Sequence, residues 1–231
     1  MRAVGRWLKW GLLGLLGLFL VWQLWLLGWV LLWGWVNPGE TRFMQIRLAE
    51  LRQKTPEARI KQQWVPYERI SVHLKRAIIA AEDAKFVDHE GFDWEGIQKA
   101  MEKNQKKGRY AAGGSTISQQ LAKNLFLTPN KSYFRKAEEA IITLMLENLW
   151  SKRRIFEVYL NVIEWGNGVF GAEAAARHYY NIGAAQLGPE QAARLAGMVP
   201  NPRLYDRNRN APGLGRKTAI IIGRMPSAEI P

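Results

Sequence analysis

The chain has 231 residues, 48% of them hydrophobic, which suits one domain of moderate size plus an appended segment. Its 33 Lys and Arg against 20 Asp and Glu give a formal net charge of +13, which favours an anionic partner such as a membrane surface or nucleic acid. The chain has no cysteine, which excludes disulfides, thiolate metal sites and cysteine nucleophiles, and its 3 histidines are too scattered to predict a zinc site.

The segment 10–36 is almost wholly apolar, with Gln23 as its only strongly polar side chain. A bilayer crossing needs about 20 such residues. A cleaved signal peptide would have a shorter apolar region, about 7–15 residues, followed by a small-residue cleavage site. No such site follows Val36. The segment is therefore predicted to be a single transmembrane helix.

The charges before this helix predict its orientation. Arg2, Arg6 and Lys9 precede the apolar run, and Lys and Arg collect on cytoplasmic flanks. Residues 1–9 are therefore expected to form a cytoplasmic tail, with the rest of the chain outside the cytoplasm. For an exported basic domain beside a bilayer, phosphate-bearing lipid is a more natural ligand than nucleic acid.

Residues 37–66 are interpreted as a connector that begins with the helix-breaking sequence Asn37-Pro38-Gly39. A short basic amphipathic pattern follows, made of Arg42, Phe43, Ile46, Arg47, Leu51 and Arg52. Two interpretations are open: a helix that lies on the bilayer, or a helix that packs against the main domain.

From residue 67 to residue 231 the pattern is helical, and we expect an all-α domain without strands. Ser71 and Asp93 are expected to cap the first two helices, and Ser115 the third. The expected helices cover 71–84, 93–106, 115–125, 133–149, 155–162, 172–180 and a segment opened by Pro189 and ended at Asn201-Pro202. The stretch 106–114 is interpreted as a basic, glycine-rich loop, and Trp165–Gly171 as a tight loop.

Three clusters carry candidate chemistry. The first is AEDAKFVDHEG (81–91), where Glu82 shares a helix face with Ile78 and Ala81. A carboxylate that is desolvated there would have a raised pKa and could abstract a proton. The alternative is an exposed helix end with ordinary acids. Asp83 could pair with a cation, and His89 could fix the loop through hydrogen bonds.

The second cluster is GGSTISQQLAKN (113–124), where Gln119 and Lys123 lie one helical turn apart, as do Gln120 and Asn124. The start of this helix offers unpaired N–H groups to an anion. A polar outer face is the alternative.

The third cluster is RKAEEAIITLMLE (135–147). Lys136, Glu139, Thr143 and Glu147 lie along one side of this helix, beside a stripe made of Phe134, Ala137, Ile141, Leu144 and Asn148. A row of helical salt bridges would look similar. The spacing does not choose between Glu138 and Glu139 as the buried acid. Together the clusters supply two carboxylates, which glycosidic chemistry needs, and cations that could neutralise a diphosphate.

These motifs resemble those of the monofunctional biosynthetic peptidoglycan glycosyltransferases, also found as the glycosyltransferase module of class A penicillin-binding proteins. The matching stretches are EDAKFVDHEG (82–91), GGSTISQQLAKN (113–124), RKAEE (135–139) with LE (146–147), and KRRIFEVYLN (152–161). The resemblance covers about 67–231. It implies a lysozyme-like helical fold with a small membrane-associated lobe, and polymerisation of lipid II into β-1,4-linked glycan with release of undecaprenyl diphosphate.

The resemblance also implies roles for single residues. Glu82 aligns with the family's catalytic base, which takes the proton of the acceptor's GlcNAc 4-hydroxyl, and Glu139 with a second, assisting glutamate. The remaining expected substrate-binding residues are Asp83, Phe86, Ser115, Gln119, Gln120, Lys123, Asn124, Lys131, Arg135, Lys136 and Arg216. Lys131 stands where the family often has an arginine, and Arg216 has Lys217 as an alternative, one residue out of register.

The resemblance predicts no required cofactor or protein-bound metal, although divalent Mg or Mn stimulates some relatives. The expected location is the bacterial inner membrane, with the catalytic domain in the periplasm. Expected partners are lipid II, the growing glycan and other cell-wall synthesis or division proteins, and no nucleic acid. No S-x-x-K, S-x-N or K-T-G set occurs, so no transpeptidase activity is expected. Two rivals stay open: a membrane-anchored lysozyme-like hydrolase, and a non-catalytic basic module.

Overall fold

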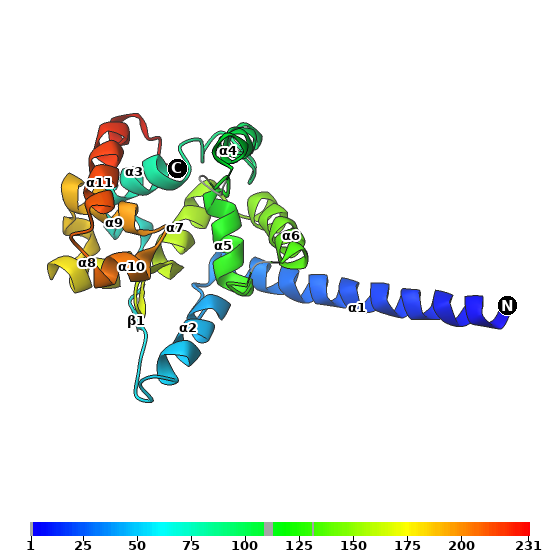
Figure 1. The fold of residues 1–231 in the computed structure, drawn as a ribbon. Helices are drawn as coiled ribbons and strands as arrows, with labels where there is room; N and C mark the ends of the chain where they lie inside the picture. The colour runs from blue at the N-terminus through cyan, green and yellow to red at the C-terminus, as the bar shows by residue number, and fades with distance from the viewer. Residues whose placement is uncertain (1, 109–112, 131) are drawn as a thin grey trace. The chain divides into compact units, whose positions relative to one another are not determined.

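The computed structural model describes residues 2–108, 113–130 and 132–231 (Figure 1). The chain divides into two compact units, Met1–Asn37 and Pro38–Pro231. All the motifs that carry candidate chemistry lie in the second unit.

The first unit is one long helix, α1 (Arg2–Trp35). Its stretch Lys9–Trp35 has 27 residues and an apolar window of mean hydropathy 2.1. At 1.5 Å per residue such a stretch is about 40 Å long, more than the roughly 30 Å of a bilayer's hydrocarbon core. The predicted apolar helix at 10–36 is thus confirmed as a helix long and apolar enough to cross a membrane.

The second unit is mostly helical, as predicted. Its helices are α2 (Arg42–Arg52), α3 (Val72–Glu82), α4 (Trp94–Lys107), α5 (Ile117–Phe126), α6 (Tyr133–Leu149), α7 (Lys152–Val162), α8 (Ala172–Tyr180), α9 (Pro189–Met198), α10 (Pro202–Arg207) and α11 (Pro212–Arg224), with short 3₁₀ turns η1 (Tyr67–Arg69), η2 (Ala184–Gln186) and η3 (Met225–Ser227). The side chains of Ser71 and Asp93 cap α3 and α4, which confirms both predicted caps.

Three short strands correct the expectation of a strand-free domain. They are β1 (Lys61–Gln62), β2 (Glu164–Gly166) and β3 (Val169–Phe170), in the order β1-β3-β2, with β1 parallel and β2 antiparallel to β3. The predicted tight loop Trp165–Gly171 is therefore a small hairpin, and Gly168 supplies a φ of +74° at its turn. Strands of two or three residues are too short for an alternating pattern to reveal them.

The connector is part of the second unit. Helix α2 packs against α5 and buries Phe43 and Met44, while Arg47 forms ion pairs with Glu50 and Glu164. Of the two interpretations left open for this segment, packing against the main domain is the one that the structure shows. Residues 38–66 therefore belong to the same compact unit as residues 67–231, and α2 contributes to the core of that unit.

Helix α5 runs through the middle of the second unit and contacts α2, α6 and α7, whereas α3, α9 and α11 pack against one another beside it (Figure 1). The buried face of α6 carries Glu139 and Thr143 together with Ile142 and Leu146. Its predicted stripe faces outward instead: the exposed fraction is 91% for Phe134 and 49% for Leu144. This helix thus turns acidic and polar side chains inward, and much of its apolar surface outward.

Candidate active site

Glu82 is the last residue of α3 and lines a pocket of about 190 Å³. The pocket's other lining residues include Ser115 and Thr116, at the start of α5, and Arg224 from α11. Burial raises the pKa of the Glu82 carboxyl, while a hydrogen bond from Gln120 and the charges of Lys217 and Lys123 act in the opposite direction. A carboxylate with a raised pKa beside an open pocket is suited to accept a proton.

One oxygen of Glu82 is held by a short chain of hydrogen bonds. Gln120 Nε2 donates to Glu82 Oε2 at 2.9 Å, and Tyr159 Oη donates to Gln120 Oε1 at 2.9 Å. Tyr159 lies on α7 and is fully buried, and burial raises the pKa of its phenol well above the usual value. The phenol therefore stays protonated and remains a donor at neutral pH.

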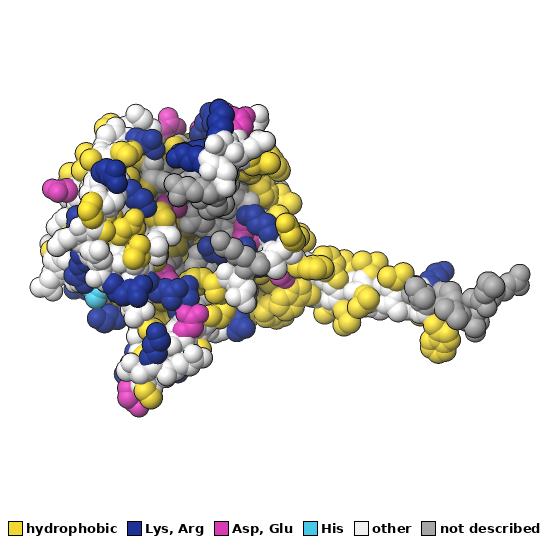
Figure 2. Space-filling model, in the orientation of Figure 1, with side chains coloured by type: hydrophobic (Ala, Val, Ile, Leu, Met, Phe, Trp, Pro, Cys, Tyr) yellow, Lys and Arg dark blue, Asp and Glu magenta, His cyan; other side chains and the backbone are white. Residues whose placement is uncertain are grey.

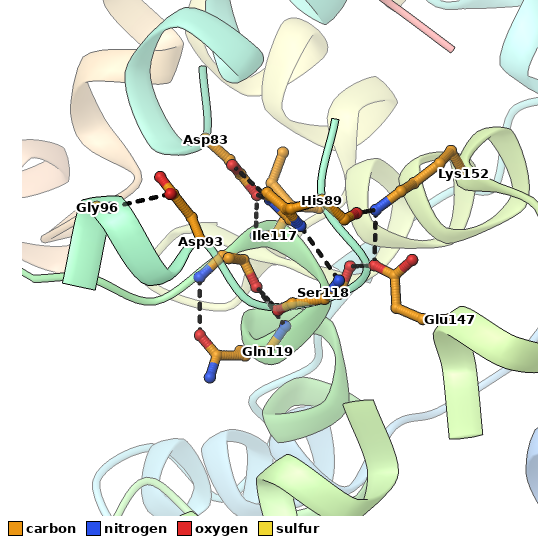
Figure 3. Close-up of polar contacts among 11 residues, drawn as sticks. Asp83, His89, Asp93, Gly96, Ile117, Ser118, Gln119, Glu147 and Lys152 are labelled. Carbon is orange, nitrogen blue, oxygen red and sulfur yellow. Dashed lines mark hydrogen bonds and ion pairs between the residues drawn. The ribbon is translucent and has the colours of Figure 1, made fainter. Parts of the chain in front are cut away.

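Asp83, the next residue, ties two elements together (Figure 3). His89 Nε2 lies 2.9 Å from Asp83 Oδ1, and the backbone N–H of Ile117 donates to Asp83 Oδ2 at 3.0 Å. The backbone N–H of Gly91 donates to His89 Nδ1, so Nε2 carries the ring proton and donates it to Asp83. His89 therefore fixes the loop after α3, as predicted, and Asp83 anchors that loop to the start of α5.

A half-buried ion pair continues this network (Figure 3). Lys152 Nζ lies 2.9 Å from Glu147 Oε1 and also donates to the backbone oxygen of His89, and Ser118 Oγ donates to the same Glu147 oxygen. Four segments meet there: the loop after α3, α5, α6 and α7. The floor around Glu82 is thus built from residues far apart in the sequence.

Glu139 is the buried acid of the third cluster, with an exposed fraction of 3%. It lies between two cations of its own helix: Arg135 Nη1 is 2.6 Å from Glu139 Oε2, and Lys136 Nζ binds Glu139 Oε1. Arg135 Nε is buried and has no hydrogen-bond partner among the described residues. Lys136 Nζ also reaches Ser115 Oγ at 3.4 Å, across to the segment before α5.

Lys123 connects the two acids electrostatically. Burial lowers the pKa of its ammonium, whereas the charges of Glu139 and Glu82 raise it. Lys123 also lines a second pocket of about 230 Å³, together with Gln120, Asn124, Asn201 and Arg203. In Figure 2 the face of the second unit shows many dark blue Lys and Arg side chains, with magenta acids among them in its hollow.

Two predicted substrate contacts, Phe86 and Gln119, are buried in the structure. Phe86 is fully buried against Phe156 and His89, so its ring cannot touch a substrate in this conformation. Gln119 is buried, and its side chain accepts the backbone N–H of Thr116 in a capping box. The capping residue of α5 is therefore Thr116, one residue after the predicted Ser115, which stays exposed.

The remaining predicted residues differ in position. Asn124 lines the second pocket, and its amide donates to the backbone oxygen of Gln120 at 2.7 Å. Arg216 is exposed, whereas the neighbouring Lys217 is the cation of α11 that acts on Glu82. Lys217 was the alternative one residue out of register, and of the two residues it is the one whose charge lowers the pKa of Glu82. Lys131 lies outside the described residues.

Sequence reasoning missed Tyr159, Thr116 and the pair Arg47–Glu164. Tyr159 stands in the matched stretch KRRIFEVYLN, but nothing in its spacing indicated that its hydroxyl reaches Gln120. Thr116 is an equally good capping residue beside Ser115, and the Gln at the third helical position was the signal that could have selected it. Among the described residues no group of three or more His, Asp or Glu could hold a metal ion.

Comparison with known proteins agrees with this geometry. The sequence model of the Transglycosylase family matches residues 49–226. The biosynthetic peptidoglycan transglycosylase of Dechloromonas aromatica (strain RCB) is 89% identical over 231 residues, which is 100% of both chains. A protein of the same name from Azoarcus sp. (strain BH72) is 62% identical over 231 residues, which is 100% of both chains. Another from Nitrosospira multiformis is 64% identical over 211 residues, which is 91% of this chain and 92% of the relative.

The chain belongs to the biosynthetic peptidoglycan transglycosylase family. It is therefore a glycosyltransferase with the lysozyme-like transglycosylase fold, as the sequence motifs predicted.

Proposed function

We propose that this glycosyltransferase polymerises glycan strands from lipid II, transferring the growing lipid-linked chain onto the GlcNAc 4-hydroxyl of an incoming lipid II. One observation carries the proposal: the ammonium of Lys123 interacts electrostatically with two acids, the proposed base Glu82 and Glu139. Glu139 in turn forms ion pairs with Arg135 and Lys136. A base beside a group of cations fits attack on a sugar that leaves a diphosphate.

In this reaction Glu82 takes the proton of the acceptor hydroxyl. The freed oxygen forms a bond to the donor's anomeric carbon from the face opposite the diphosphate, with inversion. The bond from that carbon to the phosphate oxygen breaks, and undecaprenyl diphosphate leaves with the electron pair. Proton removal by a well-placed base contributes about 10²–10⁴-fold to such a step.

The cations stabilise the negative charge that develops on the leaving diphosphate. Lys123 and Lys136 supply ammonium groups, and Arg135 supplies a guanidinium whose buried Nε has no protein partner in the described part of the chain. Glu139 holds Arg135 and Lys136 in place. With these charges the reaction is proposed to need no tightly held metal, and Mg²⁺ or Mn²⁺ would act only as a stimulant.

The substrate's lipid tail requires that the second unit work at a membrane surface. Helix α1 supplies the anchor, and the basic residues before its apolar stretch favour a cytoplasmic N-terminus with the second unit in the periplasm. Tyr133 and Phe134, with exposed fractions of 96% and 91%, are suited to the lipid interface and support a small membrane-associated lobe.

The experiment is polymerisation of labelled lipid II by the purified full-length chain. We expect Glu82→Gln to lower the rate by about 100-fold or more because the amide cannot accept the proton. Thermal unfolding of the variant checks that the fold is kept. Cleavage of finished glycan without growth of new polymer would support the hydrolase instead, and undiminished turnover by a folded Glu82→Gln chain would remove Glu82 as the base.

A further inference from the structure

The chain of hydrogen bonds behind Glu82 has a direction, and the Tyr159 hydroxyl supports it by donating to Gln120. A glutamine side chain can point either its oxygen or its NH₂ group toward Glu82. The Tyr159 hydroxyl donates to Gln120 Oε1, which leaves Nε2 to face Glu82 Oε2. The opposite orientation would bring an amide oxygen against an ionised carboxylate, which repels it.

We propose that Tyr159, acting through Gln120, is a positioning residue that orients the catalytic acid and keeps it ready to accept the acceptor's proton. Gln120, predicted as a substrate contact, becomes a structural partner of the base in this view. One oxygen of Glu82 is then held by the amide, and the other, Oε1, is left to meet the sugar hydroxyl. The proposal rests on the proposed role of Glu82.

The position of Tyr159 suits this task. Its ring is fully buried and packs against Phe156, whose ring centroid lies 6.4 Å away, so the hydroxyl has little freedom to leave Gln120. Helix α7 thereby fixes the orientation of a side chain on α5, which in turn fixes an acid at the end of α3. Because all three helices are held by the core, the base is preorganised before substrate arrives.

We call the hydrogen-bonded chain Tyr159–Gln120–Glu82 the relay. The charges around Glu82 determine how the pKa of its carboxyl responds when the relay is broken. Lys123 on α5 and Lys217 on α11 favour the ionised carboxylate, as does the bond from Gln120, whereas the charge of the adjacent Asp83 favours the protonated form. Two further charged residues, Asp93 and Arg224, line the same pocket. Removing the amide's donated bond leaves these charges in place, so the pKa of Glu82 should rise and activity should require higher pH.

The test measures the pH dependence of kcat/KM for lipid II polymerisation by the full-length chain. For Gln120→Leu we expect the acid limb to move to higher pH and kcat to fall more than for Tyr159→Phe. For Tyr159→Phe we expect the same direction and about a tenfold fall in kcat, the usual effect of one lost hydrogen bond. Tyr67→Phe is the matched control, because its hydroxyl binds the backbone oxygen of Pro231 and not the relay.

The double variant separates positioning from simple packing. If Tyr159 acts through Gln120, adding Tyr159→Phe to Gln120→Leu should cause no further fall in kcat and no further shift of the acid limb. Additive losses, or an acid limb that stays in place in both single variants, would overturn the relay. If Glu82→Gln abolishes turnover while both relay variants match the wild type, only the relay fails and the role of Glu82 stands.

A third variant keeps the test decisive if Tyr159→Phe does not fold. Gln120→Glu preserves an acceptor for the Tyr159 hydroxyl but removes the donor to Glu82 and adds a like charge. We expect it to fold and to shift the acid limb to higher pH by more than Gln120→Leu does. An unshifted acid limb in a folded Gln120→Glu chain contradicts the proposal.

Discussion

At the scale of single residues, the candidate site combines side chains that are open to solvent with buried side chains that hold the surrounding backbone. Glu82 and Lys136 keep access to solvent, whereas Asp83 and Gln119 are buried and hydrogen-bonded to backbone N–H groups. Neighbours in one motif therefore have different tasks. A motif match alone gives all of them the same label.

The proposed diphosphate cations can be tested one at a time. We expect Lys136→Ala and Lys123→Ala each to weaken binding of lipid II by roughly tenfold or more, because each removes a charge-assisted contact of about 1.5–3 kcal/mol. Equilibrium binding to a lipid II analogue with an intact diphosphate measures this. Lys103→Ala, on the exposed side of α4, serves as the control. Unchanged affinity in both site variants would remove the diphosphate role.

At the scale of elements, the loop between α3 and α4 must pass very close to α6. Gly91 has a φ of +89°, and a Cβ there would lie 2.8 Å from Thr143 Cγ2 and 3.0 Å from Glu147 Cγ. Its backbone oxygen accepts the Thr116 hydroxyl at 2.7 Å, so the same glycine also supports the cap of α5. The positive φ and the close approach to α6 together favour glycine at this position.

Gly91→Ala should therefore lower the free energy of unfolding by about 2 kcal/mol, from backbone strain and steric overlap together. The measurement is denaturant unfolding of the full-length chain in detergent. Gly215→Ala is the matched control: a Cβ there meets nothing within 4 Å and lies on helix α11, where alanine is favoured over glycine. Equal stability of the two variants would contradict the packing argument.

The outward stripe of α6 gives a prediction about the membrane. Because Phe134 is 91% exposed, its transfer to the lipid interface would favour binding by about 1.5–3 kcal/mol. We expect Phe134→Ser in a chain of residues 38–231 to bind anionic phospholipid vesicles about tenfold less tightly. Ile220→Ser, an exposed apolar side chain on α11, should bind as before. Equal binding by the Phe134 variant would argue that α6 stays out of the lipid.

At the scale of the whole molecule, the long apolar helix α1 and the helical content could be predicted because both depend on repeated local patterns. Ser71 and Asp93 cap helices where their residue types indicated. The strands could not be predicted, since β1 depends on a partner about a hundred residues away, and β2 and β3 are too short to show an alternating pattern. The inward face of α6 was missed for a related reason: a helix around a polar site buries its functional side chains and leaves apolar ones outside.

The motifs of the candidate site could be predicted from the sequence, but the contacts between its helices could not. The resemblance to family motifs indicated Glu82, Lys123, Lys136 and Glu139, whereas spacing alone left Glu138 and Glu139 both open. Neither the assignment of Phe86 to the core nor the reach of Tyr159 to Gln120 follows from spacing, because both depend on how α7 lies against α3 and α5. Packing decides such contacts, and one sequence does not display it.

The pairing of β1 with β3 has a consequence for how this chain matures. Two hydrogen bonds join Val65 and Asn161 close to this pairing, in which Lys61 lies opposite Val169. The Val65 N–H donates to Asn161 Oδ1 at 2.9 Å, and Asn161 Nδ2 donates to the Val65 backbone oxygen at 3.0 Å. The stretch from Lys61 to Val65 thus has no partner during synthesis until about a hundred residues more have emerged. Such late closure makes folding slow. The domain therefore completes its fold only after its C-terminal half has been synthesised.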